Sequence, residues 1–576
     1  MMDRAGAAVR NLWPRAVKQF VLPKMLAVMA LALVSLAGAP FTTAAADPIA
    51  ARIDAELSAA YPAGGPGAAA IVVRDGKPIL RKGYGMANVE LGVPNAPDTV
   101  FRIGSMTKQF TAVAVLMLVQ DGKIAFDDPL TKFLPNYPAR GEKITIENLL
   151  THTSGIRSYT EMPDFESNMR NDYTVPEMID HFAKEPLDFP PGTQWHYDNS
   201  GYFLLGAVIE RASGMAWGAF LQQRILDPLK MKGTYIGSND QVIPHRASGY
   251  SHDENGKLMN AALLSMTQPY AAGVLFSTVD DLARWDEALY TDKLVRSELL
   301  ARAWTAFRLP TGASTGYGYG WEVGSWDGHR VIEHDGGING FSSDGVRLPD
   351  DHLFVAVLSN DEDHQPGADT VAERIVTEAL GKPYDARPRI EVPERKLREY
   401  VGIYRIDAGS TRNVTYDAGK LYTHRSGGRK AEAIPTAPDQ FFYAETLNTL
   451  RFDRDSAGKV VGMTMSSFGR EPEKAVLSDE KPVERTAIHL DPARLDGYVG
   501  RFELAPGFVL TITRDGDRLW AQATGQSRIE ILPESERMFF LREVDARLEF
   551  ALDAQGVATG LTLHQGGQDV PGKKLQ

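Results

Sequence analysis

Residues 101–123 read FRIGSMTKQFTAVAVLMLVQDGK. Almost every residue from Phe110 to Val119 is apolar and Gly122 follows, which predicts a buried helix of about four turns ended by a C-cap glycine. Ser105 lies in the first turn and Lys108 three residues later, so both side chains share one helix face. The pattern therefore predicts a lysine amine beside a serine hydroxyl where a buried helix begins.

This serine–lysine pair suits nucleophilic catalysis. A serine hydroxyl is a weak nucleophile until a base takes its proton, and a buried lysine can be that base because desolvation lowers its pKa. The S-x-x-K spacing alone is a weak signal, since 456–459 and 478–481 also match it without opening a buried helix. The alternative for Ser105 is a helix-capping serine with a lysine that extends to solvent.

A second polar group, Tyr197-Asp198-Asn199, precedes a helical pattern that begins at Phe203. Tyr197 could act as a phenolate base or a proton shuttle if nearby cations lower its pKa from about 10. Asn199 could donate to a substrate carbonyl or orient Lys108. The alternative is a polar loop with a buried tyrosine.

A third group, His334-Asp335-Gly336-Gly337, lies between strand-like residues 320–323 and 354–358. A glycine at a sheet edge allows a substrate to approach the backbone closely. The Gly337 N–H could form an oxyanion hole with the Ser105 N–H. The alternative is a hairpin with a surface histidine.

Taken together and in this order, Ser105-Met106-Thr107-Lys108, Tyr197-Asp198-Asn199 and His334-Asp335-Gly336 resemble the signature of the serine β-lactamase and penicillin-binding-protein family, in its class C-like branch, peptidase family S12. The resemblance covers roughly residues 50–380 and implies an α+β fold, with an antiparallel sheet flanked by helices. It implies acylation of Ser105 assisted by Lys108 and Tyr197, without a metal or other cofactor. It also implies catalytic roles for Asn199 and His334 and a substrate-binding set of Asn199, His334 and Gly336. His152, in a family-like loop, is interpreted as structural.

The part of the chain after about residue 385 contains a duplication. Nine residues from Leu397 to Gly458 recur 98 positions later, from Leu495 to Gly556, and each copy opens with L-x-x-Y-V-G. Short alternating runs between turn residues predict two small all-β domains that resemble barrels. We therefore expect a signal peptide over 1–46, a catalytic domain over 47–385, and β-barrel-like repeats over 394–482 and 488–576.

The first 46 residues differ from the rest, with five basic residues before an apolar run from Met25 to Ala39 and an A-x-A site at 44–46. They predict a signal peptide, an uncleaved anchor being the alternative, and hence a periplasmic or secreted protein. The net charge of −12 argues against nucleic acid as a partner. The absence of cysteine excludes disulfides and a cysteine nucleophile.

These features predict an exported serine hydrolase that cleaves amide or ester bonds. The order of domains resembles that of D-aminopeptidases, so D-amino-acid-containing peptides are the expected substrates, and the tail repeats are expected to adjust specificity without being needed for acylation. The alternatives within the family are β-lactamase, D,D-carboxypeptidase and carboxylesterase. A cell-wall-peptide sensor that does not turn over is the alternative of another class. A homodimer is left open, and no membrane span is expected once the signal peptide is cleaved.

His334 helps to distinguish a peptidase from a β-lactamase, because the branch of the family that destroys β-lactams usually has a lysine at the position of His334. A histidine is mostly neutral above pH 7, so we expect it to hold a substrate carboxylate weakly.

Overall fold

The computed structural model describes residues 48–575, apart from 139, 140, 142, 254, 408, 409, 427, 429, 445, 483, 484, 486, 506, 542, 543 and 567. The expected signal peptide lies outside the described residues. Within the described part of the chain, no helix combines the length and apolar character that crossing a membrane would require.

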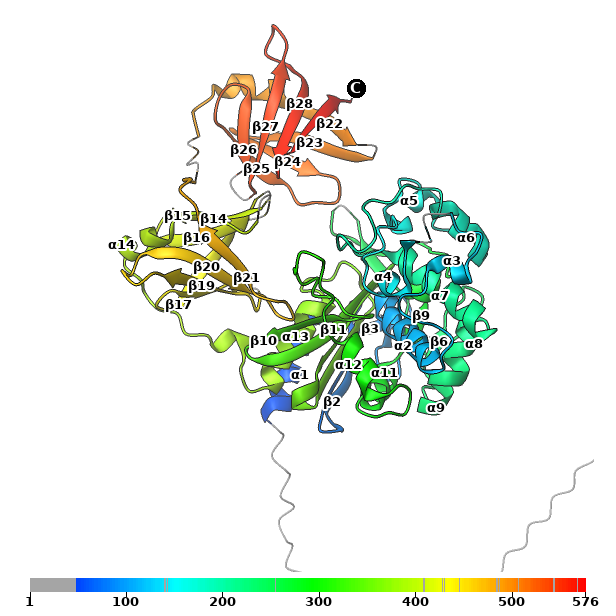
Figure 1. Ribbon diagram of the computed structural model, residues 1–576. Helices are drawn as coiled ribbons and strands as arrows, with labels where there is room; N and C mark the ends of the chain where they lie inside the picture. Colours follow the sequence, from blue (N-terminus) through cyan, green and yellow to red (C-terminus); the bar gives the residue numbers. More distant parts are fainter. Residues whose placement is uncertain are drawn as a thin grey trace, which may run out of the picture. The chain divides into compact units, whose positions relative to one another are not determined.

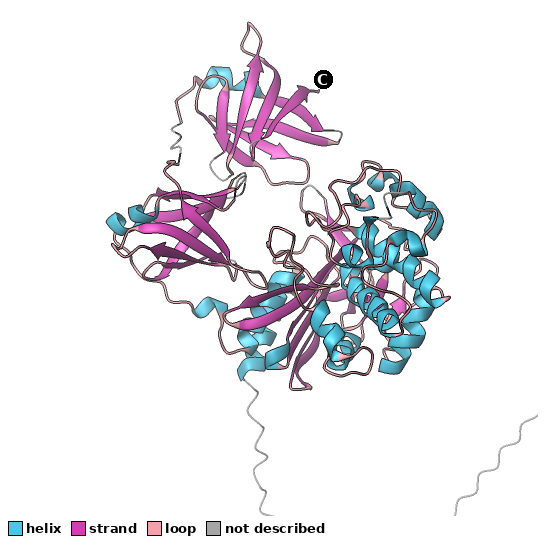
Figure 2. Cartoon of the chain, in the orientation of Figure 1, coloured by secondary structure: helices cyan, strands magenta, loops and turns pink. Residues whose placement is uncertain are grey.

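A six-stranded antiparallel sheet forms the centre of the N-terminal region (Figures 1 and 2). Two neighbouring inner strands, β1 (Ala68–Arg74) and β13 (Leu353–Ser359), read AAAIVVR and LFVAVLS, and all seven residues of the second are buried. Such unbroken apolar runs are typical of strands covered on both faces. The strand order is β10 (Glu322–Trp326), β11 (His329–Ile338), β12 (Phe341–Leu348), β13 (Leu353–Ser359), β1 (Ala68–Arg74) and β2 (Lys77–Tyr84).

Helices cover both faces of this sheet. On one face α1 (Pro48–Ala60) packs against β2 and α13 (Ala368–Ala379) packs against β12 and β13. On the other face α11 (Val279–Ala288) packs against β1 and β13. Each face therefore contributes to a separate apolar core, and the second of these cores continues into the helical region.

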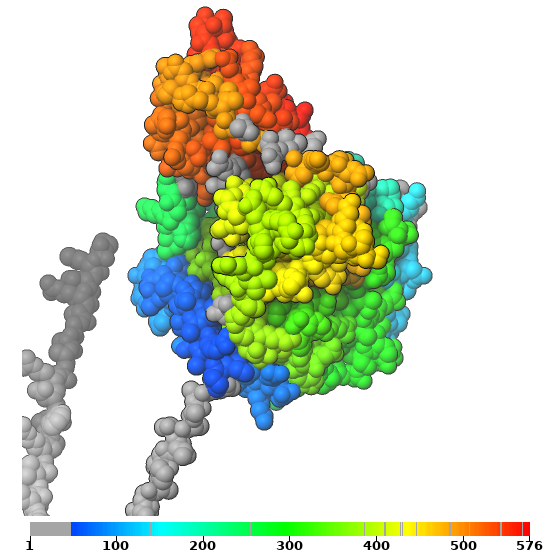
Figure 3. All heavy atoms as spheres, turned by 90° about the vertical axis from the view of Figure 1, so that its left-hand side faces the viewer, coloured from blue at the N-terminus to red at the C-terminus, as the bar shows by residue number. Residues whose placement is uncertain are grey.

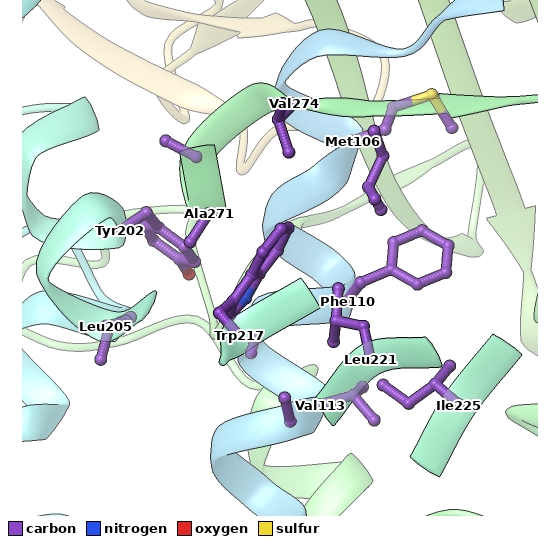
Figure 4. Packing of buried hydrophobic residues seen from close by; sticks show 14 of the residues in the cluster. Met106, Phe110, Val113, Tyr202, Leu205, Trp217, Leu221, Ile225, Ala271 and Val274 are labelled. Carbon is purple, nitrogen blue, oxygen red and sulfur yellow. The ribbon is translucent and has the colours of Figure 1, made fainter. Parts of the chain in front are cut away.

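The helical region is built around α2 (Thr107–Gln120), whose residues 107–118 are all buried. Phe110 stacks on Trp285 with ring centroids 4.1 Å apart. Figure 4 shows Phe110 and Val113 of α2 in the same cluster as Leu221 and Ile225. The other helices of this region are α3 (Leu130–Phe133), α4 (Ile146–Leu150), α5 (Phe165–Asn168), α6 (Val175–Phe182), α7 (Asn199–Ser213), α8 (Trp217–Leu221), α9 (Asp227–Leu229), α10 (Tyr270–Gly273) and α12 (Ser297–Ala303).

Short strands connect these elements. β5 (Phe101–Arg102), β9 (Leu275–Ser277) and β6 (Tyr235–Ile236) form a three-stranded sheet just before α2 begins. Two small hairpins complete the region, namely β3 (Met86–Asn88) with β4 (Val93–Pro94), and β7 (Tyr250–His252) with β8 (Leu258–Asn260).

The C-terminal region forms two closed eight-stranded barrels, which we call barrel 1 (β14–β21) and barrel 2 (β22–β29). Figure 3 shows their surfaces, barrel 1 in yellow-green to yellow and barrel 2 in orange to red. Closure leaves neither barrel with a free strand edge. The strands are β14 (Gly402–Arg405), β15 (Thr411–Asp417), β16 (Lys420–Arg425), β17 (Ala431–Ala437), β18 (Gln440–Phe442), β19 (Thr449–Arg454), β20 (Val460–Ser466), β21 (Glu473–Leu477), β22 (Gly500–Ala505), β23 (Phe508–Asp515), β24 (Arg518–Ala523), β25 (Ile529–Pro533), β26 (Met538–Leu541), β27 (Ala546–Leu552), β28 (Ala558–Gln565) and β29 (Gln568–Lys574).

The duplicated residues explain why both copies fold alike. Tyr400 stacks on Phe452 inside barrel 1, and Tyr498 packs edge to face on Phe550 inside barrel 2. The repeated Leu and Phe positions also lie in the two barrel cores. The predicted fold class is confirmed: a mixed helix and sheet catalytic fold is followed by two all-β barrels.

Candidate active site

Ser105 lies in a short 3-10 turn, η1 (Gly104–Met106), that leads directly into α2. Gly104 has a φ of +47°, and a Cβ there would come within 2.9 Å of the Gly337 carbonyl oxygen. Glycine is therefore needed at this position for two reasons, the left-handed backbone and the close approach of β11. The turn places the Ser105 hydroxyl 3.0 Å from the Lys108 amine.

Lys108 is fully buried and has three polar neighbours. Its Nζ lies 2.8 Å from Asn199 Oδ1, 2.9 Å from the Ala272 carbonyl oxygen and 3.0 Å from Ser105 Oγ. Asn199 Oδ1 and the Ala272 carbonyl can only accept hydrogen bonds. A neutral amine would therefore donate its two hydrogens to them and leave its lone pair facing the Ser105 hydroxyl.

Burial supports that neutral form, because it lowers the pKa of Lys108 to about 7, although the negative charges of Asp335 and Asp198 act in the opposite direction. A lysine amine that is half deprotonated near pH 7 is a suitable general base at neutral pH.

We expect kcat/KM for a neutral ester to rise with pH and to level off above about 7. Lys108 binds a proton below that pKa, so its base form is lost as pH falls through 7, about tenfold per pH unit. Initial rates measured from pH 5 to 9, with the Ser105→Ala variant as the blank for spontaneous hydrolysis, test this. A rate that is still rising tenfold per pH unit at pH 9, as expected for a lysine with an ordinary pKa of about 10.4, would contradict the lowered pKa of Lys108.

Tyr197 lies next to both groups. Its ring centroid is 4.8 Å from Lys108 Nζ, and its hydroxyl is hydrogen-bonded to Ser105. Burial raises the pKa of Tyr197 well above 10, and the hydrogen bond to Ser105 only partly opposes this. Tyr197 is therefore a neutral phenol at pH 7, which suits a proton shuttle rather than a phenolate base.

The loop that carries Tyr197 ends earlier than the sequence pattern indicates. α7 begins at Asn199 rather than near Phe203, because the Asp198 side chain caps the helix and accepts a hydrogen bond from the Gly201 N–H at 2.8 Å. Asn199 is thus in the first helical turn. Its Nδ2 donates to Thr160 Oγ1 at 3.1 Å, which fixes Oδ1 toward Lys108.

His152 packs beneath Tyr197, with ring centroids 4.4 Å apart. Its Nδ1 accepts a hydrogen bond from the Asp198 N–H at 3.1 Å, and its side chain is completely buried. Burial, with the nearby charge of Lys108, lowers the pKa of His152 well below 6.5. The geometry gives His152 a packing role under the tyrosine.

His334 is fully buried on β11, and both ring nitrogens have partners. Nδ1 lies 2.7 Å from the Asp335 carbonyl oxygen and Nε2 lies 2.8 Å from the Tyr317 hydroxyl. Because a carbonyl only accepts, we assign the proton to Nδ1, so that Nε2 accepts from Tyr317. Burial, with the charge of Lys108, lowers the pKa of His334 to about 3, so it is neutral and offers a substrate no free polar atom.

The two glycines of β11 differ in their surroundings. A Cβ at Gly336 would come within 2.1 Å of the Ile103 carbonyl oxygen, whereas one at Gly337 would meet nothing within 4 Å. Gly336 thus allows the strand to pack against the serine turn, and its part in substrate binding stays a prediction. Gly337 faces open space beside Ser105.

That space is a pocket of about 260 Å³ next to the nucleophile. Among the expected site residues, Ser105, Asn199 and Gly337 line it, whereas Lys108, Tyr197, His334 and Gly336 are not among its lining residues. The lining contains no charged side chain and combines apolar groups with a few amides and hydroxyls: Tyr159, Thr160, Phe165, Leu264, Gln268, Pro269, Ile338 and Asn339 among them.

Some site residues were not foreseen from the sequence. Tyr317, Thr160 and the Ala272 carbonyl hold His334, Asn199 and Lys108, but each comes from a distant segment with no spacing signal. Asp198 had a signal, since aspartate before a helical pattern is a common N-cap. In the described residues, no group of three or more His, Asp or Glu side chains is arranged to hold a metal ion.

The family model described as Beta-lactamase matches residues 55–379 of this chain. The model described as a domain of unknown function (DUF3471) matches twice, over residues 386–478 and 484–574. The second match agrees with the duplication of the barrels.

Among curated proteins, the chain is 29% identical over 400 residues to penicillin-binding protein 4* of Bacillus subtilis, covering 65% of this chain and 87% of that one. It is 28% identical to a D-aminopeptidase of Gluconobacter oxydans, over 62% of this chain and 66% of that one. Among solved structures, an octameric penicillin-binding protein homologue from Pyrococcus abyssi is 26% identical, with a TM-score of 0.52 and coverage of 74% and 99%. A D-amino acid amidase from Ochrobactrum anthropi is 25% identical, with a TM-score of 0.52 and coverage of 58% and 99%.

Proposed function

Since the chain belongs to the beta-lactamase family, we propose that it is a serine hydrolase that cleaves amide or ester bonds through an acyl-enzyme on Ser105. The observation that carries this proposal is the contact between the Ser105 hydroxyl and the buried Lys108 amine, 3.0 Å apart. A serine needs such a base to become nucleophilic at neutral pH.

In the first step, the neutral Lys108 amine takes the Ser105 proton as Oγ attacks the carbonyl carbon. The carbonyl oxygen becomes negative and is stabilised by the backbone N–H groups of Ser105 and Gly337. Tyr197, hydrogen-bonded to Ser105, passes a proton to the leaving nitrogen or oxygen and recovers it from Lys108. The C–N or C–O bond breaks and the acyl group stays on Ser105.

In the second step, water attacks the acyl-enzyme. Tyr197 relays the water proton to the neutral Lys108 amine, and the pair returns a proton to Ser105 Oγ as the acid leaves. Asn199 keeps Lys108 in place through Oδ1, and one Nδ2 hydrogen remains for a substrate carbonyl.

The finer proposal is that substrates are uncharged around the scissile bond, with D-aminoacyl amides, esters and peptides as the preferred class. Two observations support this: the pocket lining has no charged side chain, and His334 is neutral. Relatives named as a D-aminopeptidase and a D-amino acid amidase agree with it. Export to the periplasm or beyond is proposed from residues 1–46, which lie outside the described part of the chain.

We expect D-phenylalanine amide and simple p-nitrophenyl esters to be turned over, and cephalosporins to be hydrolysed poorly at both pH 7.5 and pH 6. A drug carboxylate would lack a cationic partner, because His334 binds a proton only near pH 3. Steady-state kcat/KM for these substrates, with L-phenylalanine amide as the stereochemical control, tests the preference. Efficient cephalosporin hydrolysis at pH 7.5 would reverse the assignment toward β-lactamase, and stable labelling by a fluorescent penicillin without any turnover would favour a sensor.

A further inference from the structure

The loop between β20 and β21 of barrel 1, residues 467–472, contacts the exposed edge of the central sheet. We call it the docking hairpin. Arg470 forms an antiparallel bridge with Ser325 of β10, which is the edge strand next to β11. Both segments belong to one compact unit, residues 47–576. The hairpin therefore covers backbone groups that an edge strand would otherwise expose.

The contact is close enough to require glycine on both sides. A Cβ at Gly324 would come within 2.0 Å of the Gly469 carbonyl oxygen. Gly469 has a φ of +64°, and a Cβ there would come within 2.1 Å of a Glu333 carboxylate oxygen. Neither position has room for a side chain, so the fit is specific rather than a loose surface contact.

Apolar packing continues the contact into the core. Phe468 is buried and its ring centroid lies 5.9 Å from that of Trp326 on β10. Phe468 and Leu447, both from barrel 1, share one apolar cluster with Val331 of β11. Barrel 1 thus completes a core on which the strand carrying His334 rests.

The hairpin also brings a positive charge to a group of acids. Arg470 Nη2 lies 2.5 Å from Glu322 Oε2. Glu322 pairs in register with Glu333, and Asp335 pairs with Asp344. Burial raises the pKa of Glu322 to about 7 and that of Glu333 well above its usual value, while Arg470 opposes both shifts. Glu333 and Asp335 directly flank His334 along β11, and Glu322 lies opposite Glu333 on β10.

Barrel 2 offers an internal comparison. There β28 ends at Gln565 and β29 begins at Gln568, and the positions 98 residues after Phe468 and Arg470 are Gly566 and Gln568. The longer loop with its phenylalanine and arginine therefore belongs to the first copy of the duplication, the copy that contacts the sheet.

We propose that Arg470 is a positioning residue for the reaction at Ser105, acting through Glu322 to hold the β10–β11 edge that carries His334 and Gly337. Barrel 1 is then part of the working catalytic unit, unlike the expectation from domain order that the tail only adjusts specificity. The proposal rests on the proposed function, because it concerns the same reaction.

The test uses the full-length chain and a p-nitrophenyl ester, with Arg470→Ala, Arg470→Gln and Arg470→Lys. We expect Arg470→Ala and Arg470→Gln to lower kcat by about 10- to 100-fold with little change in KM, the usual effect of removing an outer partner of a site. Arg470→Lys should recover part of the loss. Arg308→Ala is the matched control, since Arg308 pairs with Glu471 of the same hairpin at 3.6 Å and both side chains are exposed. It should retain wild-type rates.

A double-mutant cycle separates positioning from simple loss of contact area. Glu322→Gln removes the acid that needs Arg470, so Arg470→Ala should cost less kcat in that background than in the wild type. Circular dichroism and thermal melts identify folded variants, and Arg470→Gln replaces Arg470→Ala if the latter does not fold. A folded variant without Arg470 whose kcat stays within twofold of wild type overturns the proposal. Wild-type activity that survives Ser105→Ala overturns the proposed function instead.

Discussion

Replacing Ser105 with alanine is expected to abolish turnover while leaving the fold intact, with kcat falling by roughly 10⁴-fold or more. The Ser105 hydroxyl lies 3.0 Å from the Lys108 amine, and Ser105 lines the 260 Å³ pocket. Hydrolysis of a D-aminoacyl amide and of a p-nitrophenyl ester, with circular dichroism of both proteins, measures the effect.

Two matched controls come from the chain itself. Ser456 and Ser478 share the S-x-x-K spacing but lie in and after barrel 1, at a turn and beyond the last strand. Their alanine variants should retain wild-type rates. If Ser105→Ala keeps substantial activity, or if either control variant loses it, the assignment of the nucleophile is wrong.

The second large effect concerns Lys108 and Tyr197. The losses of kcat/KM in the two single variants should not multiply in the double variant. Both move the Ser105 proton, so Lys108→Met and Tyr197→Phe should each cost about 10²- to 10⁴-fold in kcat/KM, and the double variant little more than the worse single one. Methionine fills the buried space without an amine.

Tyr202→Phe is the matched control for this pair. Its ring also lies near Lys108 Nζ, at 5.7 Å, but its hydroxyl donates to the Leu150 carbonyl instead of to Ser105. It should therefore retain most of the activity. Strictly multiplicative losses for Lys108 and Tyr197 would contradict a shared proton path.

Several parts of the fold could be predicted because they depend on local pattern. The apolar run after Ser105 predicts a buried helix, and α2 is buried over residues 107–118. The exact 98-residue repeat predicts two like domains, since the repeated Tyr and Phe positions form the barrel cores. Periodicity and spacing in the sequence are enough to predict such features.

Other features depend on tertiary contacts that no spacing encodes. Tyr317 reaches His334 and Ala272 reaches Lys108 only because distant segments meet. The side-chain cap by Asp198 moves the start of α7 to Asn199, and the approach of Ile103 gives Gly336 a packing role. The contact of Arg470 with β10 arises from a loop whose length differs between the two repeats. The roles of these residues depend on tertiary contacts and not on the periodicity of the sequence.

Acylation of Ser105 can be observed directly by mass spectrometry of the protein quenched in acid during turnover of a p-nitrophenyl ester. We expect a mass increase equal to the acyl group, found on the tryptic peptide 103–108 that contains Ser105 and absent from the Ser105→Ala variant. An acyl group located on any other residue, including Ser456 or Ser478, would contradict it.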